Sequence, residues 1–252
     1  MTDAVHYEPS AGVATLTMDQ PGNRNALTPA LLNGLGDGFD AALAEPSVRV
    51  VVLTNTGPAF CAGADLSGRS GPTVQARFGL AEVLATILDS PKPVVARIAG
   101  HCMGGGVGLA AACDLSVADD SVRFGFTEVR LGVAPAIISV VCLPKLRRGD
   151  ALELFLTGER ISAARAAEVG LITSAAASNT FDAVVSELVA KLVAGGPGAL
   201  AAAKRLVFDV PSWGREEAFD RTTKLSHALF ASDEAAEGMS AFREKRRPSW
   251  AP

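Results

Sequence analysis

Residues 94–113 read VVARIAGHCMGGGVGLAAAC. The apolar start of this stretch predicts a strand, and the run of small residues at its end predicts a helix. Three consecutive glycines, Gly104 to Gly106, lie where the strand gives way to the helix. Glycines at such a junction leave backbone N–H groups unobstructed and let a ligand approach the main chain closely. The stretch therefore predicts an α/β unit with a candidate binding loop.

The same alternation of strand and helix continues on both sides of this stretch. Apolar residues alternate over 13–18, and 50–53 is a continuous apolar run, which is typical of a strand covered on both faces in a parallel sheet. Thr28 and Pro29 supply a hydroxyl cap and a first-turn proline for a helix, and residues 74–89 predict another. We therefore expect an α/β fold in which helices cover the sheets.

The C-terminal half of the chain changes to a helical pattern. Glycine- and proline-rich turns separate several of the predicted helices, which span residues 152–157, 163–169, 181–194, 199–208, 216–230 and 234–242. We place a boundary near residue 190. It divides the chain into an α/β core, residues 1–190, and a C-terminal helical region, residues 191–252.

Composition and charge exclude several classes of protein. Of the 252 residues 48% are hydrophobic, which is too many for a disordered chain. The 23 basic and 27 acidic side chains give a net charge of −4, so the basic excess that nucleic-acid binding needs is absent. The sequence has no uninterrupted apolar stretch of about 18 residues, so we predict no membrane-spanning helix. Residues 1–10 lack the apolar segment of a secretory signal. We expect a cytoplasmic globular protein.

The cysteines and histidines show no pattern of a metal or disulfide site. The four cysteines form no C-x-x-C pair, and the chain has three histidines. Because the cysteines lie among small or apolar neighbours, we expect buried, reduced thiols and no bound metal. They are Cys61, Cys102, Cys113 and Cys142.

A second glycine-containing loop, residues 60–66, follows the predicted strand at 50–53. Two such loops on neighbouring strands could each supply one N–H donor to the same developing oxyanion. A phosphate-binding loop is excluded because no lysine follows either loop, and a dinucleotide fingerprint would need a glycine where Leu109 stands. The alternative reading is that these glycines only permit close packing of helix on strand.

Five segments resemble, in chain order, those of the crotonase (enoyl-CoA hydratase/isomerase) superfamily. They are residues 57–66, 98–114, 124–135, 156–171 and 238–246, which together reach nearly from end to end of the chain. The resemblance implies a spiral of ββα units followed by C-terminal helices that mediate trimerisation. It also implies an acyl-CoA substrate, no cofactor beyond the coenzyme A of that substrate, and a homotrimer or dimer of trimers.

The resemblance also implies roles for particular residues. The backbone N–H groups of Ala64 and Gly105 would hold the thioester oxygen, and Glu128 would be the catalytic acid/base. We expect coenzyme A to lie along the loops and the basic C-terminus, where Arg24 and Lys245 are candidate phosphate ligands. The expected substrate-binding residues are Arg24, Ala26, Ala62, Asp65, Leu66, Gly104, Gly108 and Lys245.

The chain departs from the hydratases of this superfamily at one position. Those enzymes use two glutamates to add water, and the positions that correspond here are Gly108 and Glu128. A single acid/base still suffices to move a proton between two carbons, whereas the syn-addition of water lacks its second carboxylate. The residues therefore favour an enoyl-CoA hydratase/isomerase with one glutamate. A pure Δ3,Δ2-enoyl-CoA isomerase and a non-catalytic acyl-CoA-binding protein are the alternatives.

Overall fold

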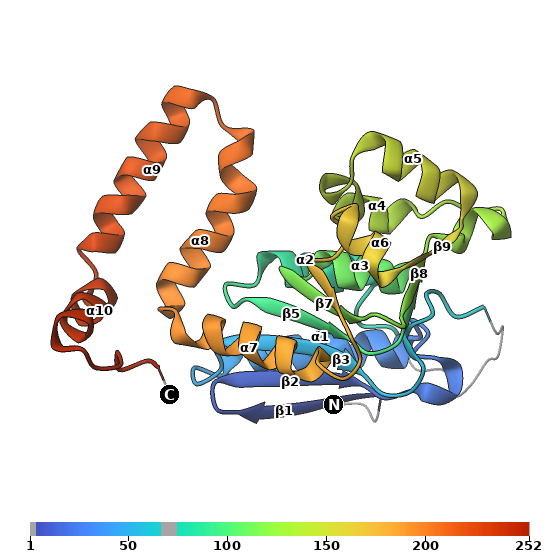
Figure 1. Ribbon diagram of the computed structural model, residues 1–252, viewed down its shortest axis with the longest axis horizontal. Helices are drawn as coiled ribbons and strands as arrows, with labels where there is room; N and C mark the ends of the chain where they lie inside the picture. Colours follow the sequence, from blue (N-terminus) through green and yellow to red (C-terminus); the bar gives the residue numbers. More distant parts are fainter. Residues whose placement is uncertain (1–3, 67–74, 252) are drawn as a thin grey trace.

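Two β-sheets with their covering helices form a body from which a helical arm projects (Figure 1). The computed structural model describes residues 4–66 and 75–251. The arm consists of α8 (Pro197–Asp209), α9 (Arg215–Phe230) and α10 (Asp233–Glu244). The predicted boundary at residue 190 falls inside α7 (Phe181–Ala194), which lies against the larger sheet as part of the body (Figure 1).

The larger sheet has six strands in the order β1-β2-β3-β5-β7-β10. The pair β1–β2 is antiparallel and the other neighbours are parallel. The strands are β1 (Val5–Ser10), β2 (Val13–Met18), β3 (Val50–Asn55), β5 (Val94–Ile98), β7 (Leu115–Asp119) and β10 (Ser174–Ala176).

The continuous apolar run in β3 is explained by helices on both of its faces. Val51 and Leu53 belong to the main core, which also contains Phe39 of α1 (Pro29–Ala44). Val50 and Val52 point to the opposite face and pack with Val193 of α7. Because successive side chains of a strand point to opposite faces, a strand between two helical layers needs apolar residues at every position.

The smaller sheet repeats the order of the larger one. Its strands run β4-β6-β8-β9, with β4 (Ala59–Cys61), β6 (His101–Met103), β8 (Arg123–Gly125) and β9 (Arg160–Ser162). Each of β4, β6 and β8 follows a strand of the larger sheet directly, and α2 (Leu80–Asp89) and α3 (Gly105–Ala112) come after the first two pairs. Each turn of the chain thus gives one strand to each sheet, which confirms the spiral of ββα units.

Most of the predicted helices are present, and the differences concern short or exposed segments. The Thr28 hydroxyl caps α1 by accepting from the backbone N–H of Leu31. The helix predicted over 74–89 begins at Leu80, and its predicted first residue lies outside the described part of the chain. The remaining body helices are α4 (Ala136–Cys142), α5 (Arg148–Thr157) and α6 (Ala163–Glu168). Of these, α4 was not predicted.

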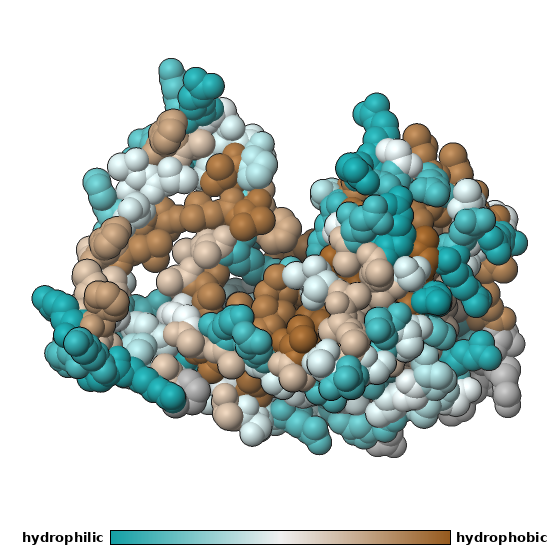
Figure 2. All heavy atoms as spheres, in the orientation of Figure 1, coloured by the Kyte–Doolittle hydropathy of each residue, from teal (hydrophilic) through white to brown (hydrophobic). Residues whose placement is uncertain are grey.

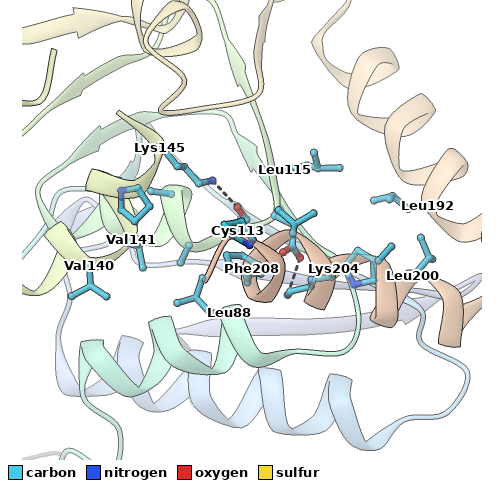
Figure 3. A pocket seen from close by; sticks show the side chains of 18 residues that line it. Leu88, Cys113, Leu115, Val140, Val141, Lys145, Leu192, Leu200, Lys204 and Phe208 are labelled. Carbon is cyan, nitrogen blue, oxygen red and sulfur yellow. Dashed lines mark hydrogen bonds and ion pairs between the residues drawn. The ribbon is translucent and has the colours of Figure 1, made fainter. Parts of the chain in front are cut away.

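A buried ion pair fixes the first helix of the arm to the body. Lys204 of α8 is 9% exposed; its Nζ lies 3.0 Å from Asp114 and donates to the carbonyl of Ile87 at 2.8 Å. An apolar cavity of about 750 Å³ lies beside this pair, between α8, α4 and the end of α3 (Figure 3).

In the described part of the chain, no single helix has the length and the apolar composition to cross a membrane. Helix α7 and residues 197–212 meet these two criteria only when they are taken together, and the two segments are bent by 108°.

We predict that Gly106→Ala strongly destabilises the body. A Cβ at this position would lie 2.4 Å from the carbonyl oxygen of Cys61 and 2.8 Å from its Cβ. Neither atom can turn aside as a flexible side chain would, so the two loops would have to separate, at a cost of about 1–3 kcal/mol or more. The measurement is the thermal unfolding midpoint.

Gly149→Ala is the matched control. Gly149 lies in α5, and nothing lies within 4 Å of a Cβ built there. Alanine should leave the midpoint unchanged or raise it slightly, because it lowers the entropy of the unfolded chain. Equal midpoints for Gly106→Ala and the wild type would contradict the close-packing argument.

Candidate active site

The first loop is held in place by a buried asparagine that the sequence did not single out. The Asn25 side chain is fully buried and donates to the carbonyls of Thr56 at 3.1 Å and Ala59 at 2.8 Å. Its oxygen accepts from the backbone N–H of Gln20 at 2.7 Å. With its amide group satisfied on three sides, Asn25 ties residues 20–27 to the end of β3 and the start of β4.

Residues 24–27 in turn support the loop that follows β4. The N–H of Ala62 donates to the carbonyl of Arg24 at 3.0 Å, and the N–H of Leu27 donates to the carbonyl of Gly63 at 2.8 Å. Ala64 forms an isolated parallel bridge with Leu27. The structure therefore brings the predicted site residues of these two segments together.

The two glycine-containing loops touch each other. Gly63 has a φ of +87°, and a Cβ there would lie 3.0 Å from the carbonyl oxygen of Met103 and 3.4 Å from the nitrogen of Gly105. Gly105 is the first residue of α3, so its N–H has no partner within the helix. Within residues 4–66 and 75–251, the N–H groups of Ala64 and Gly105 donate to no acceptor. Two unused donors thus lie on adjoining loops.

Glu128 faces the second loop from the 3-10 helix Thr127–Leu131. Its Oε1 would lie 3.0 Å from a Cβ at Gly104. Its Oε2 is buried, and no group in the described part of the chain hydrogen-bonds to it. Burial raises the pKa of this carboxyl, and a hydrogen bond to the residue's own backbone offsets part of the rise. A partly buried carboxyl with a raised pKa beside two unused N–H donors is suited to general acid/base chemistry.

Gly108 lies one helical turn beyond Gly104, and its N–H donates to the Gly104 carbonyl at 3.3 Å. The side chain of Ile138 occupies the space beside it, since a Cβ at Gly108 would lie 2.2 Å from the Ile138 Cγ2. Both residues are buried. Gly108 therefore faces Ile138 rather than open space, and its role in substrate binding stays a prediction.

The remaining predicted residues divide between the loops and the arm. Ala26 is buried and Ala62 half-buried, whereas Arg24, Asp65 and Leu66 are exposed next to them. Each belongs either to residues 20–27 or to the loop that follows β4.

Lys245 is not near these residues within the chain, because it caps the end of α10 in the arm (Figure 1). Its neighbour Arg246 is paired with Glu237 at 2.7 Å and Glu244 at 2.6 Å, and this pairing lowers the pKa of Glu237 to about 2. His101 is exposed, and its Nδ1 accepts from the backbone N–H of Arg123 at 3.1 Å. These polar groups belong to the surface.

The cysteines are buried thiols. All four are free, as predicted, and burial raises the pKa of Cys61, beside the first loop, to about 12. A thiol with that pKa stays protonated at neutral pH and is a poor nucleophile. In the described residues, no three His, Cys, Asp or Glu side chains gather where they could hold a metal ion.

The chain is similar to one family over nearly its whole length. Residues 8–252 match the family described as enoyl-CoA hydratase/isomerase. The 2,3-dehydroadipyl-CoA hydratase of Escherichia coli is 31% identical over 241 residues, which cover 94% of each chain.

Two solved structures extend this similarity to the backbone. An enoyl-CoA hydratase of Mycobacterium smegmatis is 33% identical, with a TM-score of 0.89 and 99% of both chains covered. One of Mycobacterium avium is 44% identical, with a TM-score of 0.74, and covers 99% of this chain and 100% of its own. The chain therefore has the crotonase fold and belongs to the enoyl-CoA hydratase/isomerase family.

Proposed function

We propose that the protein acts on enoyl-CoA thioesters through an oxyanion hole and a single glutamate acid/base. The observation that carries the proposal is the buried, unpartnered carboxyl oxygen of Glu128 beside two loops with unused N–H donors. Coenzyme A is part of the substrate in this scheme, and no further cofactor takes part. The names of the relatives, which are those of enoyl-CoA hydratases, support the proposed class of substrate.

The oxyanion hole is formed by the N–H groups of Ala64 and Gly105, which donate to the thioester oxygen. When a proton leaves C2 of the substrate, the electron pair of the broken C–H bond moves toward this oxygen. Two donors already aimed at the oxygen stabilise that charge without reorganising, and one such donor is worth about 3–4 kcal/mol. Glu128 accepts the proton from C2.

Isomerisation follows from the same groups without a further participant. In a 3-enoyl thioester the electrons released at C2 spread through the C3=C4 bond to form a dienolate. Glu128 then returns its proton to C4, the C2=C3 bond forms, and the thioester carbonyl is restored. The enzyme ends in its starting state, so one carboxyl group acting alternately as base and acid is sufficient.

A single carboxyl group favours isomerisation over hydration. Addition of water to C3 needs a group that holds and deprotonates the water while C2 receives a proton. Gly108 offers no such group, and Ile138 fills the adjoining space. The Δ3,Δ2-enoyl-CoA isomerase is therefore the more specific form of the proposal, and a protein that binds acyl-CoA without turnover is the remaining alternative.

Coenzyme A is proposed to lie along residues 24–26 and 62–66. Arg24 is exposed beside this path and carries a charge that suits a phosphate. Lys245 lies on the arm, so in our proposal it contacts the coenzyme A held by a neighbouring subunit.

We also propose that the arm packs against further copies of this chain in a trimer or a dimer of trimers. Large apolar side chains are exposed along it, among them Phe219 and Phe230 at 68% and 70%. Figure 2 shows apolar side chains gathered on the arm where it faces the body and in the hollow between them. Exposed apolar surface of this extent is typical of subunit contacts.

We predict that Glu128→Gln lowers kcat for the best enoyl-CoA substrate by about 10²–10⁴, because the amide keeps the shape but cannot accept a proton. Affinity for a saturated acyl-CoA should change little. Glu216→Gln, at an exposed position of α9, is the matched control and should leave kcat unchanged. Wild-type turnover by Glu128→Gln would refute the mechanism.

We predict that activity falls with decreasing pH at a higher pH than an ordinary glutamate would give. Only ionised Glu128 can take the C2 proton, and burial raises the pKa of its carboxyl. The acid limb of the kcat/KM profile should therefore lie above the usual glutamate range, with full activity on its alkaline side. A limb at the ordinary glutamate value would show that the carboxyl is well solvated in the free enzyme.

We predict that Phe219→Asp dissociates the assembly. Phe219 is exposed within a single chain, so aspartate should leave the fold intact but place a charge in the proposed contact. Sedimentation equilibrium at micromolar concentration should change from a multiple of the 25.9 kDa chain mass to the chain mass itself. Ser212→Asp, which adds a charge at an exposed polar position of the arm, is the control. A wild-type protein that sediments as a single chain would disprove the assembly.

A further inference from the structure

The contact between Ile138 and Gly108 is too close for a side chain at both positions. Ile138 is 3% exposed in α4, and a Cβ at Gly108 would lie 2.2 Å from its Cγ2 and 2.8 Å from its Cβ. An alanine at residue 138 would still have its Cβ 2.8 Å from a Cβ at Gly108. Glycine at 108 and isoleucine at 138 are therefore sterically coupled, because the isoleucine fits only where residue 108 has no side chain. Gly108 thus makes room for Ile138 in addition to lacking a carboxylate.

This pair lies one helical turn from the contact between Gly104 and Glu128. Gly104 is the N-cap of α3, and its carbonyl accepts from the N–H of Gly108 at 3.3 Å. A Cβ at Gly104 would lie 3.0 Å from the Oε1 of Glu128. On α4, Cys142 is four residues beyond Ile138, and Glu128 is among the groups that raise the pKa of the Cys142 thiol. Ile138 thus lies one turn from a residue of α4 that is within electrostatic range of the carboxyl, and it presents hydrocarbon to α3 at Gly108.

Several charged groups on the elements around Glu128 are engaged with other partners. Arg130, on the same 3-10 helix, donates to the carbonyl of Thr157 at 3.3 Å. On α5, Asp150 pairs with Arg165 at 2.7 Å, and Glu153 lies 3.6 Å from the same guanidinium. Cys142 is neutral, because burial raises its pKa to about 12. Burial is the largest influence on the pKa of the Glu128 carboxyl.

We propose that Ile138 determines the reaction outcome by keeping water and any second carboxylate away from the face of the site next to Glu128. This inference rests on the proposed function and adds to it the residue that sets the product. With that face closed by hydrocarbon, the proton taken from C2 stays on Glu128 until it is returned to C4. Water that reached the carboxyl would exchange this proton or add to C3.

The test compares Ile138→Ala with Val141→Ala. Val141 is also buried in α4 but lines the cavity next to the arm, so Val141→Ala is a matched loss of packing on the side of α4 that faces α8 (Figure 3). Each variant converts a 3-enoyl thioester in deuterated water. Ile138→Ala should raise solvent deuterium in the product several-fold, since water can now reach the unpartnered Oε2. Val141→Ala should match the wild type, and equal incorporation in all three proteins would overturn the proposal.

A second measurement does not depend on turnover. The pKa of the Glu128 carboxyl is followed by infrared spectroscopy in the ligand-free protein, with Glu128→Gln to assign the band. Ile138→Ala should lower this pKa toward its ordinary value, and Val141→Ala should not. An inactive wild type that shows this difference would refute the proposed function but support the role of Ile138. A pKa that Ile138→Ala leaves unchanged would refute that role, whatever the activity.

A double substitution at residues 108 and 138 tests whether a carboxylate fits at residue 108 once Ile138 is removed. Gly108→Glu alone should unfold at lower temperature, because Ile138 occupies its space. Gly108→Glu with Ile138→Gly removes the clash, and it should recover stability relative to Gly108→Glu and form measurable 3-hydroxyacyl product. Where Ile138→Ala folds poorly, Ile138→Val serves as the milder variant, with a smaller change in the same direction. No recovery of stability in the double variant would contradict the steric pairing.

Discussion

The close crossing of two main chains is the constraint on which the site depends. The loop after β4 and the start of α3 approach until a single Cβ at Gly106 would meet the carbonyl oxygen of Cys61 at 2.4 Å. This approach places the N–H groups of Ala64 and Gly105 on adjoining segments, where they can serve one oxygen. Side chains at the crossing would separate the donors, and preorganised donors lose their value when they must first move together.

Desolvation is the second physical factor at this site, and it acts on the Glu128 carboxyl and on the backbone N–H groups in different ways. Burial disfavours the charged form of Glu128 and so raises its pKa, which makes the carboxyl a stronger base once it is ionised. The same scarcity of water strengthens the attraction between N–H donors and an oxyanion. In our proposal, Ile138 contributes to both effects by presenting hydrocarbon beside the helix that carries Gly105.

The arm is joined to the body by specific polar contacts as well as by apolar packing. Lys204 pairs with Asp114 in a buried setting, and Arg49 donates to the carbonyls of Gly195 and Trp250 at the two ends of the arm. Burial raises the pKa of Asp114, and the charge of Lys204 offsets part of that rise. Such a pair fixes geometry more than it adds stability, because desolvation cancels much of its attraction. It orients α8, and the apolar cavity next to it remains open in the single chain (Figure 3).

The sequence by itself determined the α/β class, the long helices and the two glycine-containing loops. These features are local: the period of apolar residues reports which faces are covered, and glycine reports a close approach of the main chain. The order of segments 57–66, 98–114 and 124–135 identified the family as well. The sequence does not predict the short strands β4 and β6, because three residues are too few to show a period.

Only the tertiary structure showed what lies opposite each glycine and each polar group. Asn25 carries no pattern of its own in the sequence, yet its three hydrogen bonds reach residues up to 34 positions away. Gly108 looked like an absent carboxylate, and the structure shows that Ile138, 30 residues later, fills its place. Contacts between residues so distant in the chain are set by the packing of whole helices and strands, which no local pattern records.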